Sequence, residues 1–185
     1  MRKILTLLAF CASLFASDAY VVSKTPLLDK ANGKEIAIMH VGAKLNVIKD
    51  DGKFAEVSYS GFVPQDSTNA YSKLGILELD VEAKDPKILK TVKKTMDEYD
   101  NEWLQVSITG FVAKDALTSD GAQVLTKGEA LFKERCGNCH ALHGYDEFSV
   151  NVWPSVIETM VGNAGLVGDE TEYLVRFLQS KAPLE

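Results

Sequence analysis

The sequence is poor in the residue types that build disulfide frameworks and multi-ligand metal sites, since it has three cysteines and three histidines among 185 residues. A structural zinc site needs four ligands, and no second Cys/His pair accompanies the closely spaced Cys136 and Cys139. A thioredoxin-like redox pair would need a βαβ setting, which the flanking sequence does not offer. The scarcity of thiols therefore points to one special use of Cys136 and Cys139.

Long apolar runs are also lacking. The apolar run near the start, Ile4–Phe15, follows the basic residues Arg2 and Lys3 and is too short to span a bilayer as a helix. This arrangement predicts a cleaved secretory signal over residues 1–17, and with it a periplasmic location. An uncleaved anchor is the alternative, because no clear Ala-x-Ala site is present. Cleavage would remove Cys11 and leave two cysteines, so no disulfide would be available besides them.

The sequence has fewer basic residues than acidic ones. The 20 Lys and Arg residues stand against 26 Asp and Glu residues, which gives a formal net charge of −6. Loss of Arg2 and Lys3 with the signal would remove two positive charges and no acid, which makes the charge −8 instead of −6. An acidic surface argues against nucleic-acid binding and favours a partner with a basic docking patch.

The most informative motif in the chain is Cys136-Gly137-Asn138-Cys139-His140. Two cysteines separated by two residues, with a histidine directly after the second, form the attachment site of c-type haem. Each thiol adds across one vinyl group of the porphyrin, and the adjacent histidine supplies the proximal nitrogen ligand of the iron. The motif predicts one covalently bound haem c. Because such haem is attached outside the cytoplasm, the motif and the predicted export signal agree.

The middle of the chain contains an internal repeat. Val57–Val63 (VSYSGFV) matches Val106–Val112 (VSITGFV) at an offset of 49 residues. A hairpin-type pair at Asp51-Gly52 and the β-branched segments around it indicate short strands joined by tight turns. The Ser/Thr-Gly-Phe-Val pattern resembles bacterial SH3-like domains, which are small five-stranded barrels.

We therefore expect two SH3-like barrels in tandem, over residues 18–67 and 68–117. The second copy contains one conflict, because apolar residues within Pro86–Tyr99 fall at helical spacing. The repeat argues for strands there, and we follow the repeat. His40 has no cluster of related residues near it in the sequence, so we expect it at the surface or otherwise satisfied.

Helical signals follow a polar linker at residues 118–123. The segment Gly128–Arg135 leads straight into the haem motif. The segment Asp169–Gln179 opens with an expected capping box of Asp169 and Glu172. It continues with an apolar stripe of Tyr173, Leu174, Phe177 and Leu178.

These two segments resemble the crossed terminal helices of class I cytochromes c, in which a small residue such as Gly128 lets the helices approach closely. The resemblance implies a small all-α haem domain over residues 124–185. The expected fold class is therefore an all-β N-terminal part, made of two small barrels, plus a small all-α class I-like cytochrome c domain.

The class I resemblance also implies a second axial ligand on the other face of the haem. The candidates in the sequence are His40, His143, Met39, Met96 and Met160. From His140, His143 reaches at most ~10 Å along an extended chain, which is too short to wrap around a flat porphyrin. Met160 is the only methionine of the expected domain and shares a helix face with Val156 and Ile157. We predict Met160 as the distal ligand; a plain core methionine is the alternative.

The segment from Cys136 to His143, followed by Asn151–Met160, resembles the C-terminal haem domain of pentahaem quinol-oxidising cytochromes. Those cytochromes serve periplasmic molybdenum reductases of trimethylamine N-oxide. This sequence has one haem motif and not five. The resemblance implies an electron-transfer protein that is not itself an enzyme. Its implied partners are a molybdenum-dependent N-oxide or S-oxide reductase and an upstream quinol-linked or cytochrome donor.

Two other classes of function stay open. Without a distal ligand, the iron would be five-coordinate and could bind a small gas, as a haem sensor does. Bacterial SH3-like domains can also bind peptidoglycan, so a cell-wall-associated module is the second alternative. Binding of carbon monoxide or nitric oxide to the ferrous protein without displacement of a ligand would favour the sensor. Retention on purified cell wall would favour the wall-associated module.

Overall fold

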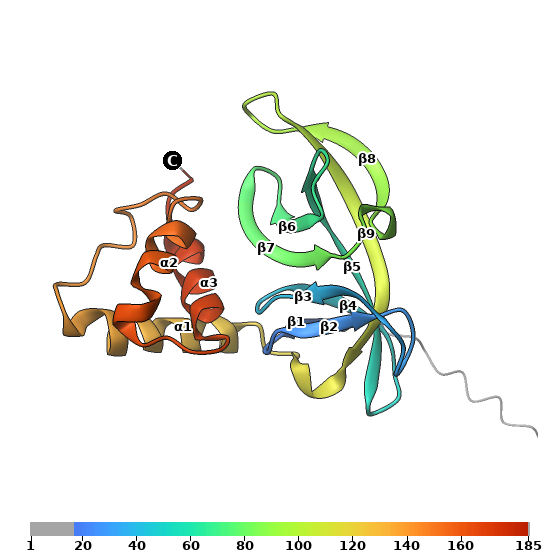
Figure 1. Ribbon diagram of the computed structural model, residues 1–185, viewed down its shortest axis with the longest axis horizontal. Helices are drawn as coiled ribbons and strands as arrows, with labels where there is room; N and C mark the ends of the chain where they lie inside the picture. The colour runs from blue at the N-terminus through green and yellow to red at the C-terminus, as the bar shows by residue number, and fades with distance from the viewer. Residues whose placement is uncertain (1–16, 185) are drawn as a thin grey trace, which may run out of the picture.

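The computed structural model describes residues 17–184, so nearly all of the predicted signal segment lies outside the described residues. Within them, ten strands are followed by three α-helices (Figure 1). The strands are β1 (Ser17–Val21), β2 (Thr25–Leu28), β3 (Glu35–Met39), β4 (Lys44–Asp50), β5 (Phe54–Pro64), β6 (Asn69–Lys73), β7 (Ile76–Ala83), β8 (Lys90–Met96), β9 (Glu102–Ala113) and β10 (Leu117–Thr118). The helices are α1 (Ala122–Arg135), α2 (Trp153–Ala164) and α3 (Glu170–Lys181).

The two copies of the repeat are the long strands β5 and β9, which pair with each other in antiparallel register along their whole length. Tyr59 lies opposite Ile108, and these two residues are equivalent at the offset of 49. On either side, Ser58 faces Thr109 and Ser60 faces Ser107. The pairing therefore has an approximate two-fold axis at Tyr59 and Ile108 that exchanges the two copies.

The same symmetry extends around a closed ring of strands. Because β5 and β9 pair directly, the order β5-β6-β7-β3-β2-β9 closes on itself, with β8 outside β9 and β4, β1 and β10 outside β5. β6 pairs with β5 at Phe62, and β2 pairs with β9 at Phe111, which is the repeat equivalent of Phe62. β3 and β7 pair across the far side of the ring, with Ile38 opposite Glu82. Each copy thus contributes two hairpins that pair with hairpins of the other copy.

The predicted fold class is wrong in both of its parts. The repeats do not form two separate barrels, because β2 and β6 each pair with the long strand of the other copy. Val57 and Val106, from the two copies, lie in one shared hydrophobic core. The helices do not form an all-α domain of their own, because α3 packs polar side chains into the strands, as described below. Of the residues that the structure describes, 39% are in strands and 28% are helical, so this part of the chain is mostly β.

Most of the disputed segment Pro86–Tyr99 is the strand β8 (Lys90–Met96), which confirms the choice of a strand over a helix. A short 3-10 turn at Pro86–Ile88 begins where Asp85 Oδ1 accepts a hydrogen bond of 2.9 Å from the Lys87 amide. β8 follows and forms the edge of the sheet. Three of its seven residues are lysines, and lysines on an edge strand oppose pairing with other chains.

The helices α1 and α3 cross at Gly128, as the sequence predicts. A Cβ at this position would collide with the Tyr173 carbonyl oxygen and lie 2.5 Å from Phe177 Cβ. The apolar stripe expected on α3 (Tyr173, Leu174, Phe177 and Leu178) is buried throughout. Leu174, Phe177 and Leu178 form most of the helical core with Phe132 of α1 and Trp153 of α2, while Tyr173 packs with Val41, Val124 and Leu131.

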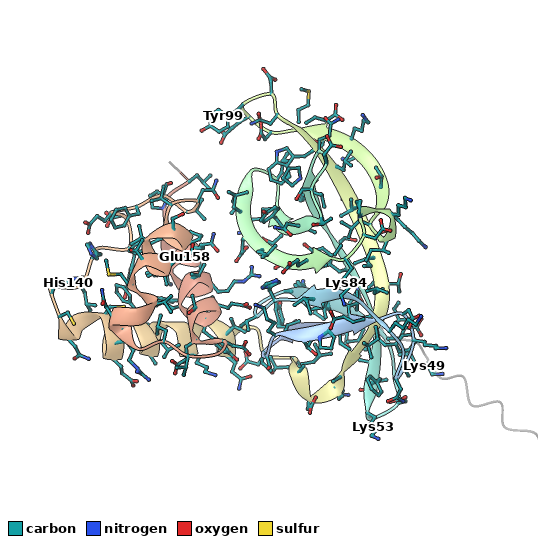
Figure 2. The ribbon with its side chains drawn as sticks, in the orientation of Figure 1. Lys49, Lys53, Lys84, Tyr99, His140 and Glu158 are labelled. Atoms are coloured by element: carbon teal, nitrogen blue, oxygen red, sulfur yellow. The ribbon has the colours of Figure 1, made fainter. Side chains whose placement is uncertain are left out.

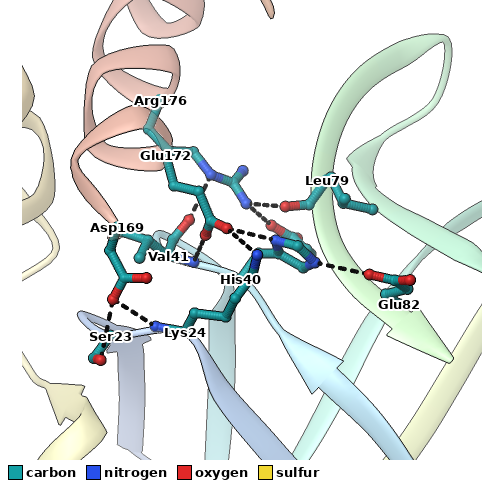
Figure 3. A network of polar contacts seen from close by, with 10 residues as sticks. Ser23, Lys24, His40, Val41, Leu79, Glu82, Asp169, Glu172 and Arg176 are labelled. Carbon is teal, nitrogen blue, oxygen red and sulfur yellow. Dashed lines mark hydrogen bonds and ion pairs between the residues drawn. The ribbon is translucent and has the colours of Figure 1, made fainter. Parts of the chain in front are cut away.

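A second, polar face of α3 binds the strands (Figure 3). Glu172 Oε2 accepts a hydrogen bond of 2.8 Å from the Val41 amide, and its Oε1 lies 3.0 Å from His40 Nδ1 and 2.8 Å from Lys24 Nζ. Asp169 Oδ2 accepts hydrogen bonds from Ser23 Oγ and the Lys24 amide. Burial alone would raise the pKa of Glu172, but these partners outweigh it and hold the pKa at about 2.

These contacts correct two predictions. The helix begins where expected, but Asp169 and Glu172 do not form a capping box, because Asp169 bonds to the loop between β1 and β2 and Glu172 bonds to the loop between β3 and β4. His40 does have a cluster around it. It is 7% exposed and lies between Glu172 and Glu82, whose Oε2 is 3.7 Å from His40 Nε2.

One helical turn further along, Arg176 enters the strands and is almost wholly buried. Its Nε donates to the Val41 carbonyl over 2.6 Å, and its two terminal nitrogens pair with Asp80 at 2.7 Å and Glu78 at 3.1 Å. Burial raises the pKa of Asp80, although the guanidinium opposes that shift. The ion pair therefore compensates two carboxylates that would otherwise be very costly to bury.

The approximate two-fold axis relates two faces of the strand ring, and α3 docks on one of them. The bond from the His40 amide to the Asp80 carbonyl (2.9 Å) has a counterpart from the Lys84 amide to the Ile36 carbonyl (3.0 Å). In β3 and β7, the pairing of Ile38 with Glu82 places equivalent positions 44 residues apart and not 49, so the equivalents of Glu78 and Asp80 are Lys34 and Ile36. A buried guanidinium would find no carboxylates there, so the sequence difference selects the face of docking.

Candidate functional site

A pocket of about 290 Å³ lies between the end of α1, the following loop and α2, and it brings together all four predicted site residues, Cys136, Cys139, His140 and Met160. The cysteines and the histidine come from the turn and loop after α1, and the methionine comes from α2. His140 lies at the outer edge of the helical part, on the side away from the strands (Figure 2).

The inner wall of the pocket is apolar and firmly packed. Phe132, Trp153 and Ile157 line it and are each no more than 3% exposed. The Trp153 indole nitrogen donates to the Tyr145 carbonyl over 3.2 Å, and the Trp153 ring meets the edge of Phe148 with centroids 5.0 Å apart. These contacts fix the loop between the haem motif and α2, so the wall is preformed.

The end of α1 sets the position of the two thiols. The Cys136 amide still donates to the Phe132 carbonyl, and a 3-10 turn at Cys136–Asn138 continues from the helix. Asn138 Nδ2 donates back to the Glu134 carbonyl over 2.8 Å, which closes the turn. Cys136 is half-buried and Cys139 is exposed; neither is in a disulfide. Burial raises the pKa of the Cys136 thiol.

His140 has one ring nitrogen engaged and one available. Its Nδ1 lies 2.7 Å from the Ala141 carbonyl, which accepts a hydrogen bond only if Nδ1 carries the proton. That tautomer leaves the lone pair on Nε2, the form in which a neutral imidazole binds a metal. His143 also lines the pocket, but its ring lies against the His140 ring at 5.1 Å, and its Nδ1 is 2.9 Å from Glu147 Oε2.

Met160 is 38% exposed, which is high for a methionine on a packed helix. It lines the pocket with Val156 and Ile157, the two residues predicted to share its helix face. The other methionine and histidine candidates lie elsewhere. Met39 is buried in the core of the strands, Met96 is on the edge strand β8, and His40 is in the contact between α3 and the strands.

The donor set and the apolar lining of the pocket fit a haem. A flat apolar macrocycle needs an apolar wall, and a c-type haem needs two thiols at this spacing with an adjacent imidazole. The pocket supplies all of these, and it adds a thioether from a second element. Within residues 17–184, no group of three or more His, Cys, Asp or Glu side chains is placed to hold a bare metal ion.

Comparisons with known proteins point in the same direction. The chain is 29% identical over 157 residues to the cytochrome c-type protein TorY of Escherichia coli O157:H7, a match that covers 80% of this chain and 41% of that protein. It is 28% identical over 174 residues to TorY of Haemophilus influenzae, with 90% and 46% covered. It is 21% identical over 145 residues to the cytochrome c-type protein TorC of Escherichia coli K12, with 76% and 37% covered.

The chain therefore resembles TorY and TorC cytochrome c-type proteins, and the matches span less than half the length of these relatives. No family model and no solved structure matches the chain. Among the described residues, no helix is both long and apolar enough to cross a membrane.

Proposed function

We propose that this protein is a c-type cytochrome that carries single electrons on one covalently bound haem. One observation carries the proposal: a preformed apolar pocket gathers Cys136, Cys139, His140 and Met160 from two separate elements. The resemblance to TorY and TorC cytochrome c-type proteins supports it independently. A bound haem would supply the one-electron chemistry, by cycling its iron between the ferrous and ferric states.

Each side chain of the pocket then has a defined role. Cys136 and Cys139 would hold the haem through thioether bonds to its two vinyl groups. His140 would offer Nε2 to the iron, because the Ala141 carbonyl accepts a hydrogen bond from Nδ1 and so holds the ring in the tautomer with a free lone pair on Nε2. Met160 would offer its sulfur to the iron as the second protein ligand. A His/Met pair favours ferrous iron and raises the reduction potential.

The proposed partners follow from the family resemblance. We place the chain in the periplasm as an electron donor or carrier subunit for a molybdenum-dependent N-oxide or S-oxide reductase, loaded by a quinol-linked or cytochrome donor. The matches cover under half of the length of TorY and TorC, so we do not propose the activity of those whole proteins for this chain. Its own single haem motif limits it to passing one electron at a time.

The distal ligand gives a direct test of the site. The oxidised protein should show the charge-transfer band of methionine-bound ferric haem, and Met160→Ala should abolish it. Met96→Ala is the matched control, because Met96 is an exposed methionine on β8. Persistence of the band in Met160→Ala would remove Met160 from the site. Carbon monoxide binding to the ferrous wild type without a displacement step would instead favour a haem sensor.

A further inference from the structure

The edge strand β8 and the turn before it carry a local excess of positive charge. Residues 84–94 hold five lysines and one acid, although acids outnumber basic residues in the chain as a whole. Six of the seven residues of β8 are exposed. All five lysines of the segment are exposed as well; they are Lys84, Lys87, Lys90, Lys93 and Lys94.

Most of this positive charge is not neutralised within the molecule. Two of the lysines form ion pairs, one with Glu35 and one with Glu102, each over 2.7 Å. The one acid of the segment, Asp85, accepts a hydrogen bond from a backbone amide. The remaining lysines form no ion pair with any residue between 17 and 184; they are Lys87, Lys90 and Lys93. Their charges are therefore available to an external anion.

A β-bulge places two of the unpaired lysines on one face of the strand. Side chains alternate along a regular strand, so Lys90 and Lys93, three residues apart, would point to opposite faces. Their partners on β9, Ser107 and Gln105, are two residues apart and therefore share a face. The extra residue in β8 is Val92, which the register shift leaves without a partner and which is 62% exposed. The bulge thus gathers positive charge beside an exposed apolar side chain.

The form of this edge narrows the class of partner. A bulge and several lysines on an edge strand oppose the addition of another strand, so backbone pairing with a protein segment is disfavoured. A membrane surface needs no backbone pairing. Its anionic headgroups attract lysines, and the boundary with the acyl chains takes up nearby apolar side chains. β8 supplies both kinds of group, since Val92 and Met96 are 62% and 56% exposed.

We infer that β8 and the turn before it bind an anionic phospholipid surface through the lysines of residues 84–94. In Figure 1, β8 lies on the outer side of the strands and the helices lie on the other side. Residues 136–175, which include the haem motif and α2, hold six acids and no Lys or Arg. An anionic surface repels that segment, so a chain held at β8 presents its pocket to the aqueous phase and to a soluble partner.

The size of the effect follows from the number of lysines. A lysine close to an anionic membrane surface strengthens binding about fivefold. The loss of two lysines should therefore weaken binding about 25-fold. Because the Debye length falls from about 30 Å at 0.01 M salt to about 8 Å at physiological salt, binding should also weaken as salt is added.

The test is sedimentation of the mature chain with vesicles at low salt; the mature chain is used because residues 1–17 are apolar enough to bind lipid themselves. The chain should bind vesicles of phosphatidylcholine mixed with phosphatidylglycerol and should not bind phosphatidylcholine alone. The double variant Lys90→Gln/Lys93→Gln should bind about 25-fold more weakly. Lys90→Arg/Lys93→Arg keeps both charges and should bind as the wild type does.

The matched control is Lys49→Gln/Lys53→Gln. It makes the same change in net charge at two exposed lysines on the hairpin of β4 and β5, beside the other end of β9 (Figure 2). Binding of this variant to the anionic vesicles should equal that of the wild type.

Three results would overturn the inference: no binding to anionic vesicles at low salt, equal binding to neutral vesicles, or an equal loss of binding in the two glutamine variants. Poly-glutamate is the probe for the other class of partner, an acidic protein. If the chain binds poly-glutamate and does not bind anionic vesicles, the surface serves an acidic protein and the lipid role is refuted. These outcomes are independent of the haem, because none of the lysines lines the pocket.

Discussion

Gly128 offers the sharpest test of the helical packing beneath the pocket. Alanine has a helix propensity about 1 kcal/mol better than glycine, so Gly128→Ala would stabilise α1 if the helix stood alone. In the structure, the added Cβ would collide with the Tyr173 carbonyl and reach 2.5 Å from Phe177 Cβ. The first of these atoms is backbone in the middle of α3, so relief requires the two helices to move apart.

The magnitude follows from setting these two effects against each other. Overpacking a core costs roughly 1–3 kcal/mol, and a collision with backbone lies at the upper end of that range. After the gain in propensity is subtracted, we expect Gly128→Ala to lower the free energy of unfolding by about 2 kcal/mol. With a urea m-value of roughly 2 kcal/mol per molar, the midpoint should fall by about 1 M.

Gly162 provides the matched control. It lies in α2, and a Cβ there would have nothing within 4 Å. Gly162→Ala should therefore keep the propensity gain and raise the midpoint in the same urea titration, followed by circular dichroism. If Gly128→Ala is as stable as the wild type or rises with Gly162→Ala, the close crossing of α1 and α3 is refuted.

Two further predictions concern the contact between α3 and the strands. The pKa of Glu172 in the folded protein is about 2, below its usual 4.5, so its contribution to stability is complete above pH 4.5 and is lost as the pH falls toward 2. Glu172→Gln should therefore lower the free energy of unfolding by about 2 kcal/mol at pH 7 and by less at pH 3. Urea unfolding at the two pH values measures both costs. An equal cost at both pH values would contradict this. Arg176→Met should cost about 3–5 kcal/mol in the same assay, because it leaves the buried Asp80 without its cation, and the double variant with Asp80→Asn should recover part of the loss. No recovery in the double variant would show that the pair is not coupled.

Short-range signals in the sequence singled out four residues that the structure gathers around one pocket. The spacing of Cys136, Cys139 and His140 is a covalent requirement of the haem, so it is visible without a fold. The face shared by Val156, Ile157 and Met160 follows from helical periodicity, and the structure turns it into the pocket. The close crossing at Gly128 was implied by the resemblance to class I cytochromes c, and the structure gives its physical reason, because an added Cβ would collide with the Tyr173 carbonyl oxygen.

The arrangement of the strands could not be predicted in the same way. The repeat at Val57–Val63 and Val106–Val112 shows which residues alternate inward, but alternation does not say which strand a hairpin pairs with. Tandem barrels and one intertwined ring satisfy the same pattern. The ring forms because β5 and β9 pair with each other, a contact between segments 49 residues apart.

The polar face of α3 was missed for a related reason. Asp169 and Glu172 have the spacing of a capping box, and that local reading was wrong because partners from the strands compete for both carboxylates. The signal that could have revealed the docking face is the polar stripe Glu172, Arg176 and Gln179 beside the apolar one. Gln179 does bridge to the strand side, since its Nε2 lies 3.3 Å from the Leu77 carbonyl.

The central claim is that one haem is bound covalently through Cys136 and Cys139. The most direct measurement is the intact mass of the purified protein after export from a host that attaches c-type haem. The account predicts the mature chain plus one haem, with the added mass retained after denaturation and absent from a variant with both cysteines changed to alanine. A wild-type protein whose mass equals the polypeptide alone, or that loses its haem on denaturation, would contradict it.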